Sequence, residues 1–317
     1  MTLNNNISFR STAGKKPTPN IFEAFRQRVQ ADGGTFEDNG AVETAVRNWN
    51  SNRKLLITPT AYKSGKAYSI IPKDGSGDAT VDRNCTATFV DSNGIPQTAA
   101  LNELRIDHST GEPCILVEGQ ATNYVSKRNF QLWGVTRATA TDLGDNIYSA
   151  VATDLDPILS LSTGYFGISG FFKVEIKGVG SSIGKNARLF VIRDAFSEIK
   201  QLPFVLTGDW QTIEIPYTFS AIPTTKTDVR IDFVDSAVAV GDTAHLRNPQ
   251  LSEISTSYIP TNGAIATRLA DTVTIPIPTG TTQIIETLSD DTENIITTIP
   301  ATYTIPVGLF KKIEMFG

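Results

Sequence analysis

Residues Asn248 to Asp271 read NPQLSEISTSYIPTNGAIATRLAD. This stretch decides the fold, because it follows a long region in which apolar residues alternate with polar ones. Leu246, Leu251 and Ile254 are spaced to fill a hydrophobic core. The following segment 257–261 (SYIPT) should be extended, because the residue before a proline is sterically excluded from the helical region. We therefore expect the closing strand of a β-sandwich, followed by a segment that acts as a hinge between domains and not as a binding site.

The residues before this stretch alternate with a period of two. Apolar side chains at every second position alternate with charged ones in two runs, which are Phe172, Val174 and Ile176, and Val229, Ile231 and Phe233. This alternation is typical of antiparallel strands with one solvated face. Because such strands recur with turn signals between them, the sequence predicts a mainly β chain with an antiparallel sandwich over 126–270.

Helical periodicity is convincing only in the stretch 20–50. Phe22, Phe25 and Val29 share one face of a first helix, which the glycine pair at 33–34 ends. A second helix is predicted by four residues at i, i+3, i+4 and i+7, which are Val42, Ala45, Val46 and Trp49. Together they predict a helical hairpin that is too small to bury its apolar faces alone, so it should pack on the sandwich or on another subunit.

These patterns divide the chain into four parts. An N-terminal arm with the helical hairpin spans 1–53, a β-rich first region spans 54–125, and a small C-terminal β unit at 271–317 follows the sandwich. Residues 308–316 are unusually apolar for their position, so a strand within this chain or across a subunit boundary should hold them.

Composition excludes several classes of function. A net charge of -5 argues against nucleic acid as the main partner, because phosphate binding needs a basic surface. Cys85 and Cys114 are too few for a disulfide framework; one bridge between them is possible, and two buried thiols are favoured. His108 and His245 form no cluster for a metal or for acid–base work, and each is interpreted as a surface or hydrogen-bonded histidine.

Neither targeting nor catalytic motifs are found in the sequence. No stretch approaches the roughly twenty apolar residues of a membrane span, and no secretory signal opens the chain, so synthesis in a cytoplasm is expected. Nucleophile-elbow, zinc-histidine and phosphate-loop motifs are absent, so we expect no enzymatic activity, no catalytic residues and no cofactor. The acidic run 74–78 (DGSGD) could suggest calcium, but it has no terminal bidentate glutamate, and a plain turn is favoured.

Two long segments resemble structural proteins of tailed bacteriophages. Residues 76–125 read SGDATVDRNCTATFVDSNGIPQTAALNELRIDHSTGEPCILVEGQATNYV, which resembles the family text GDLTVTRASTATRVNSAGLIETV…PRIDYTGG…LLLEPQRTNLV. The opening stretch resembles the signature QLE…TSYIPT…TRxAD, and RVQADGG at 28–34 resembles a short motif near the start of such proteins. The resemblance covers 76–133 and resumes at 200–271, and this chain has His108 where the family usually has tyrosine.

The resemblance implies a jelly-roll module related to carbohydrate-binding sandwich domains. It also implies a virion protein on the particle exterior, such as a head fibre, spike, decoration or tail-fibre component. Its partners would be other virion proteins, further copies of itself in a trimer, and a host-surface glycan. A purely architectural subunit is the alternative, and a glycan depolymerase is a third and less favoured hypothesis.

A glycan site in such a module would use aromatic rings, because a sugar ring presents C–H groups to the negative face of an aromatic ring. Tyr148 and Tyr165 lie in loop-like sequence and are the candidate ligand-binding residues. Trp133 and Trp210 are predicted to pack in the core, since large aromatic side chains are mostly buried. Asn248 stands where sugar-binding relatives carry an acid that holds structural calcium, so no metal site is expected.

Overall fold

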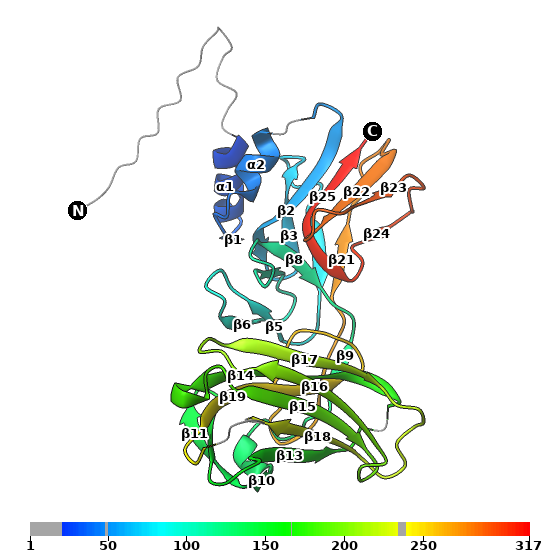
Figure 1. Cartoon of the computed structure of the whole chain (residues 1–317). Helices are drawn as coiled ribbons and strands as arrows, with labels where there is room; N and C mark the ends of the chain where they lie inside the picture. The colour runs from blue at the N-terminus through cyan, green and yellow to red at the C-terminus, as the bar shows by residue number, and fades with distance from the viewer. Residues whose placement is uncertain (1–20, 48–49, 166, 234–238) are drawn as a thin grey trace, which may run out of the picture.

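The protein, seen in a computed structural model, consists of two β-rich bodies, with the sandwich below and a second sheet above it (Figure 1). The structure describes residues 21–47, 50–165, 167–233 and 239–317. The N-terminal arm and Trp49, which the sequence assigns to the second helix, lie outside the described residues.

The upper body is built on one large sheet that combines strands from both ends of the chain. Its main path runs β23-β22-β25-β2-β3-β4-β21-β24, with β1, β7 and β8 attached beside it. The strands are β1 (Thr35–Phe36), β2 (Arg53–Lys63), β3 (Lys66–Ile71), β4 (Ala79–Asp82), β7 (Arg105–Asp107), β8 (Cys114–Val117), β21 (Thr272–Ile275), β22 (Gln283–Leu288), β23 (Glu293–Ile296), β24 (Tyr303–Thr304) and β25 (Gly308–Phe316).

Strand β25 explains the apolar run at 308–316. It pairs with β22 on one side and with β2 on the other, and Ile313 and Met315 are fully buried in the core of the upper body. The segment is therefore held within this chain. The sequence treats 54–125 and 271–317 as separate β units, whereas the hydrogen-bonded path joins their strands in one sheet.

The two helices are present, but they do not form a clear hairpin. Helix α1 (Ile21–Ala31) buries Phe25 and Val29 as its periodicity predicts, and α2 (Ala41–Arg47) buries Val42. Strand β1 lies between the helices and pairs with β2. Because their buried side chains cluster with Leu56 and other residues of β2 and β3, the helices pack on the upper sheet and not on the sandwich.

The lower body is an antiparallel jelly-roll sandwich of two five-stranded sheets. One sheet contains β10 (Gly134–Thr136), β13 (Ile158–Thr163), β18 (Thr227–Asp232), β15 (Asn186–Arg193) and β16 (Glu198–Val205) in spatial order. The other contains β11 (Ala138–Gly144), β12 (Ile147–Ala152), β19 (Thr243–Ser252), β14 (Ser169–Val179) and β17 (Gln211–Thr218). The predicted fold class is confirmed.

The sandwich core follows the alternation read from the sequence. Phe172, Val174 and Ile176 of β14 are fully buried, whereas the lysines and glutamate between them face outward. Trp133, 4% exposed, packs against Phe130 of the short 3-10 turn Phe130–Leu132, so its predicted core position is confirmed. Ile254 is not in the core as expected, because it lies beyond the end of β19 and is 39% exposed.

The chain reaches the sandwich from β8 and returns from it into β21, so the sandwich is inserted between two strands of the upper sheet. At the crossing, β9 (Ala121–Asn123) pairs with β20 (Ala266–Arg268). The hairpin of β5 (Ala87–Val90) and β6 (Pro96–Ala99) lies beside the crossing, next to β17 of the sandwich (Figure 1).

Three smaller expectations can be compared with the structure. Cys85 and Cys114 are both free thiols, so the possible bridge between them does not form. Asp78 forms an ion pair with Arg28 at 3.1 Å, and Asp74 accepts a hydrogen bond from the backbone N–H of Ser76, as in an ordinary turn. Among the helices that the structure describes, none has the length and apolarity needed to cross a membrane.

Candidate functional site

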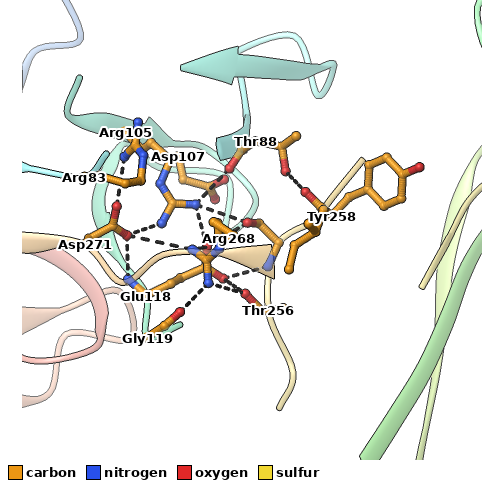
Figure 2. Close-up of polar contacts among 12 residues, drawn as sticks. Arg83, Thr88, Arg105, Asp107, Glu118, Gly119, Thr256, Tyr258, Arg268 and Asp271 are labelled. Carbon is orange, nitrogen blue, oxygen red and sulfur yellow. Dashed lines mark hydrogen bonds and ion pairs between the residues drawn. The ribbon is translucent and has the colours of Figure 1, made fainter. Parts of the chain in front are cut away.

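The most recognisable residues of the sequence meet in one buried ion network (Figure 2). Three arginines and two carboxylates form it, namely Arg83, Arg105, Arg268, Glu118 and Asp271. All three arginine side chains are almost completely buried. The five residues come from the ends of different strands around the domain crossing, so the motifs that are scattered along the chain converge there.

Each carboxylate binds several donors. Asp271 accepts hydrogen bonds from Arg83 Nη1 at 2.8 Å and from Arg105 Nη2, and its Oδ2 also accepts the backbone N–H of Glu118 at 2.8 Å. Glu118 Oε2 accepts from Arg105 Nη1 and Arg268 Nη1, each at 2.5 Å.

The second oxygen of Glu118 binds the segment that leaves the sandwich. Its Oε1 accepts from Thr256 Oγ1 at 2.7 Å and from the backbone N–H of Ser257 at 2.6 Å. The stretch that the sequence predicts to be a hinge is therefore fixed to the upper body by a buried carboxylate.

The electrostatics of Glu118 show which effect dominates in the network. Burial raises the pKa of this carboxyl, but Arg105 and Arg268 outweigh burial and lower the pKa to about 2. Burial also lowers the pKa of the Arg268 guanidinium, which Glu118 and Asp271 oppose. Glu118 is therefore ionised at neutral pH, and it depends on its arginine partners because an unpaired buried charge is costly.

A cleft of about 350 Å³ lies between the β5–β6 hairpin and the outer face of the sandwich sheet. Thr88, Phe89, Val90 and Pro96 of the hairpin form one wall, and Lys173, Glu175, Thr212 and Asn248 of the sandwich form the opposite wall. Tyr258 also lines the cleft, and its ring points away from the ion network (Figure 2). Phe89 and Tyr258 are half-buried, so the cleft combines aromatic rings with groups that can bind hydroxyls.

The polar wall of the cleft is held in place by its own hydrogen bonds. Glu175 accepts from Arg247 Nε at 2.6 Å and from Asn248 Nδ2 at 2.7 Å. Asn248 has a φ of 55°, beside a shift in the β14–β19 register, and such a bulge aims a side chain in a new direction. Lys173 donates to the carbonyl of Thr256, and burial lowers the pKa of its ammonium group against the opposing effect of Glu214.

The two tyrosines predicted to bind ligand do not reach this cleft. Tyr148 is 4% exposed and packs against Phe130 in the sandwich core. Tyr165 is 7% exposed; its ring lies 4.4 Å from that of Tyr124, and its hydroxyl donates to the carbonyl of Ser169 at 2.7 Å. Neither ring offers a free face to a sugar in this arrangement, because each is enclosed by other side chains.

Trp210, predicted to be in the core, lies instead on the outer face of the sandwich sheet. It is half-buried, with the guanidinium carbon of Arg247 4.2 Å from its ring centroid and Lys177 Nζ 5.1 Å away. The aromatic residues of the cleft and of the sheet surface that the sequence does not single out are therefore Phe89, Tyr258 and Trp210. The alternation of β14 is the sequence signal that bears on Trp210. It places Lys177 on the solvated face, and the Trp210 ring lies beside Lys177.

The two histidines lie in different bodies of the protein, and neither lines the cleft. His108 lies 4.0 Å from Glu37 in the upper body, and His245 faces outward on β19, where burial lowers its pKa. Within the described ranges, no group of three histidine, cysteine or acidic residues is arranged to hold a metal ion.

Comparisons with known proteins gave matches among solved structures only, since no protein-family model and no curated protein matches the sequence. A family 29 carbohydrate-binding module from Piromyces equi is 13% identical, with a TM-score of 0.30, over 57% of this chain and 95% of that one. The CBM22-1 xylan-binding domain from Paenibacillus barcinonensis is 12% identical, with a TM-score of 0.32, over 43% and 94%. A module solved with β-1,4-galactotriose, TmCBM61, is 17% identical, with a TM-score of 0.30, over 41% and 97%.

Proposed function

We propose that this protein is a non-enzymatic structural component on the exterior of a bacteriophage virion, and that its sandwich binds a host-surface glycan. The cleft beside the domain crossing carries the glycan part of the proposal. The virion part rests on the resemblance of 76–133 and 200–271 to phage structural proteins.

The composition of the cleft suits a sugar polymer. Phe89 and Tyr258 offer apolar ring surface, while Glu175, Asn248 and Thr212 offer acceptors and donors on the facing wall. Sugars need both, because C–H groups stack on aromatic faces and hydroxyls need hydrogen-bonding partners when they leave water. A cavity of about 350 Å³ lies in the size range of ligand sites and has room for a short segment of a glycan.

A glycan array probed with the full chain tests binding, and variants locate it. We expect Phe89→Ala to weaken the best array hit by about tenfold, the loss of about 1.4 kcal/mol of stacking and apolar contact. Phe196→Ala is the matched control, because Phe196 is exposed but lies outside the cleft. Absence of any hit at millimolar glycan would refute the binding role.

The virion role and the oligomeric state have separate tests. Immunogold labelling of intact particles should place the protein on the particle surface, and light scattering should give the mass of a trimer. A label found on cell envelopes and never on particles would contradict the virion assignment.

A purely architectural role is the alternative, and one surface favours it. Strand β16 is an edge strand that exposes Ile199 and Val205, and Phe196, which comes shortly before the strand, is also exposed. Exposed edges with apolar side chains can pair with another chain. If Ile199→Lys abolishes incorporation into particles while the chain binds no glycan, the architectural role is the better description.

A depolymerase activity has less support from the cleft. A glycosidase needs a carboxylic acid whose pKa is raised enough to donate a proton. The carboxyl of Glu118 has a pKa of about 2, and Glu175 is already bonded to Arg247 and Asn248. We expect no reducing ends to be released from host capsule or lipopolysaccharide; their release would refute the non-enzymatic assignment.

A further inference from the structure

The outer face of β14 and β19 carries a second feature next to the cleft, which is a tryptophan ring between two cations. We propose that Trp210, Arg247 and Lys177 form a subsite for a carboxylate-bearing sugar, so that the ligand is an anionic polysaccharide. This inference rests on the proposed glycan binding and specifies the chemical class of the glycan.

The two cations are available to a ligand. Among the residues that the structure describes, Lys177 has no ion-pair or hydrogen-bond partner, and its contact is with the Trp210 ring at 5.1 Å. Arg247 uses Nε to bind Glu175 at 2.6 Å, which leaves its two terminal nitrogens without a partner in the described part of the chain. An arginine held in this way presents a fork that matches the two oxygens of a carboxylate.

The strand register places these groups together. Glu175 of β14 pairs with Arg247 of β19, and Lys177 pairs with His245, so Arg247 and Lys177 lie on adjacent strands and on the same face. Trp210 directly precedes Gln211, the residue of β17 that pairs with Ile176 of β14. The ring therefore lies on the third strand at the level of Lys177, where it holds the two cations side by side for a sugar carboxylate.

Charge around the subsite favours an anion. The chain as a whole carries a net charge of -5, yet this face carries two cations, and the carboxylate of Glu175 is already bonded to Arg247 and Asn248. A local cationic surface attracts anionic ligands even when the net charge of the protein is negative. A neutral glycan would leave both cations without a carboxylate partner.

The subsite is continuous with the cleft. Glu175 lines the cleft and also binds Arg247, so a polymer that occupies the cleft reaches Trp210 with its neighbouring sugar units. This continuity selects a polysaccharide over a single acidic sugar. The cleft would bind any suitable glycan chain, while the cationic subsite would select for the acid.

The test compares trigalacturonate with α-1,4-galactotriose, its neutral counterpart of the same linkage, by titration calorimetry on the full chain at low and high salt. We expect trigalacturonate to bind about tenfold more tightly at low salt, the value of one charge-assisted hydrogen bond, and the preference to shrink at high salt. Lys177→Gln should remove most of the preference without weakening galactotriose. Lys200→Gln, on the edge strand β16 of the opposite sheet, is the control and should leave both affinities unchanged.

The outcomes separate this inference from the proposed function. Equal affinity for both sugars, unchanged by Lys177→Gln, would overturn the acidic subsite while leaving glycan binding intact. A preference for sulfated galactotriose over trigalacturonate would overturn carboxylate recognition. If neither sugar nor any array glycan binds, the proposed function fails and the inference fails with it.

Discussion

Replacing Glu118 with glutamine removes one negative charge from the buried network while keeping the shape of the side chain. Glu118 Oε2 accepts from Arg105, Arg268 and the hydroxyl of Ser257, and Oε1 accepts from Thr256 and the Ser257 backbone. Whichever oxygen becomes an amide nitrogen, it faces donors that it cannot satisfy. The three buried arginines then share the single charge of Asp271.

The size of the effect follows from two independent estimates. The pKa of Glu118 is lowered from 4.5 to about 2, and at about 1.4 kcal/mol for each pKa unit this corresponds to about 3 kcal/mol of stability. Removing one partner from a buried ion pair typically costs about 3–5 kcal/mol. We therefore expect Glu118→Gln to lower the free energy of unfolding by about 3 kcal/mol at pH 7.

The pH dependence has a defined sign. Because the folded-state pKa lies below the unfolded-state value, this contribution is complete above about pH 4.5 and is lost as the pH falls through about 2. The difference between the wild-type protein and Glu118→Gln should therefore be constant from pH 7 to about pH 5 and shrink at lower pH.

Urea unfolding followed by both tryptophan fluorescence and circular dichroism measures the change, and the earliest transition is compared because a two-body chain need not unfold in one step. Exposed Glu293 supplies the matched control, and Glu293→Gln should change the free energy by less than about 0.5 kcal/mol. If Glu118→Gln costs less than about 1 kcal/mol, or as little as the control, the network does not hold the bodies together as argued.

Three further changes test the packing. Gly170→Ala places a methyl group 2.6 Å from the carbonyl oxygen of Ser252, so thermal unfolding should show a loss of about 1–3 kcal/mol, whereas Gly164→Ala, with nothing within 4 Å, should not. Phe172→Ala empties a fully buried position of the sandwich core and should cost about 3–5 kcal/mol by urea titration; a loss below 1 kcal/mol would contradict that position. Removing 308–317 deletes β25 from between β22 and β2, and limited proteolysis should then degrade the upper body before the sandwich; equal resistance would contradict the pairing.

Local periodicity predicts the sandwich because it depends on residues close in sequence. The alternation around Phe172 gives both the strand and its buried face, and the helix face with Phe25 and Val29 is confirmed in the same way. Pairing over long distances leaves no such local signal. The contact of β25 with β2 brings together residues from opposite ends of the chain, so it could not be read from either strand alone.

The candidate site was harder to predict for a related reason. The sequence around Tyr148 and Tyr165 looks like loops, yet burial is decided by what packs over a residue, and both rings are enclosed. Trp210 was assigned to the core on general frequency, but its position beside Lys177 follows from the β14–β17 register. Phe89 lines the cleft only because a hairpin of the upper body folds over the sandwich.

The insertion of the sandwich between β8 and β21 has a consequence for the order of events during synthesis on the ribosome. Strands β2 and β8 emerge early, but β25, which pairs with both, is translated only after every residue of the sandwich. Nascent domains fold as units, so the sandwich can complete its core while the upper sheet still has open edges. We therefore expect chaperones to be needed for the upper body, because its first strands are synthesised long before β25 can pair with them.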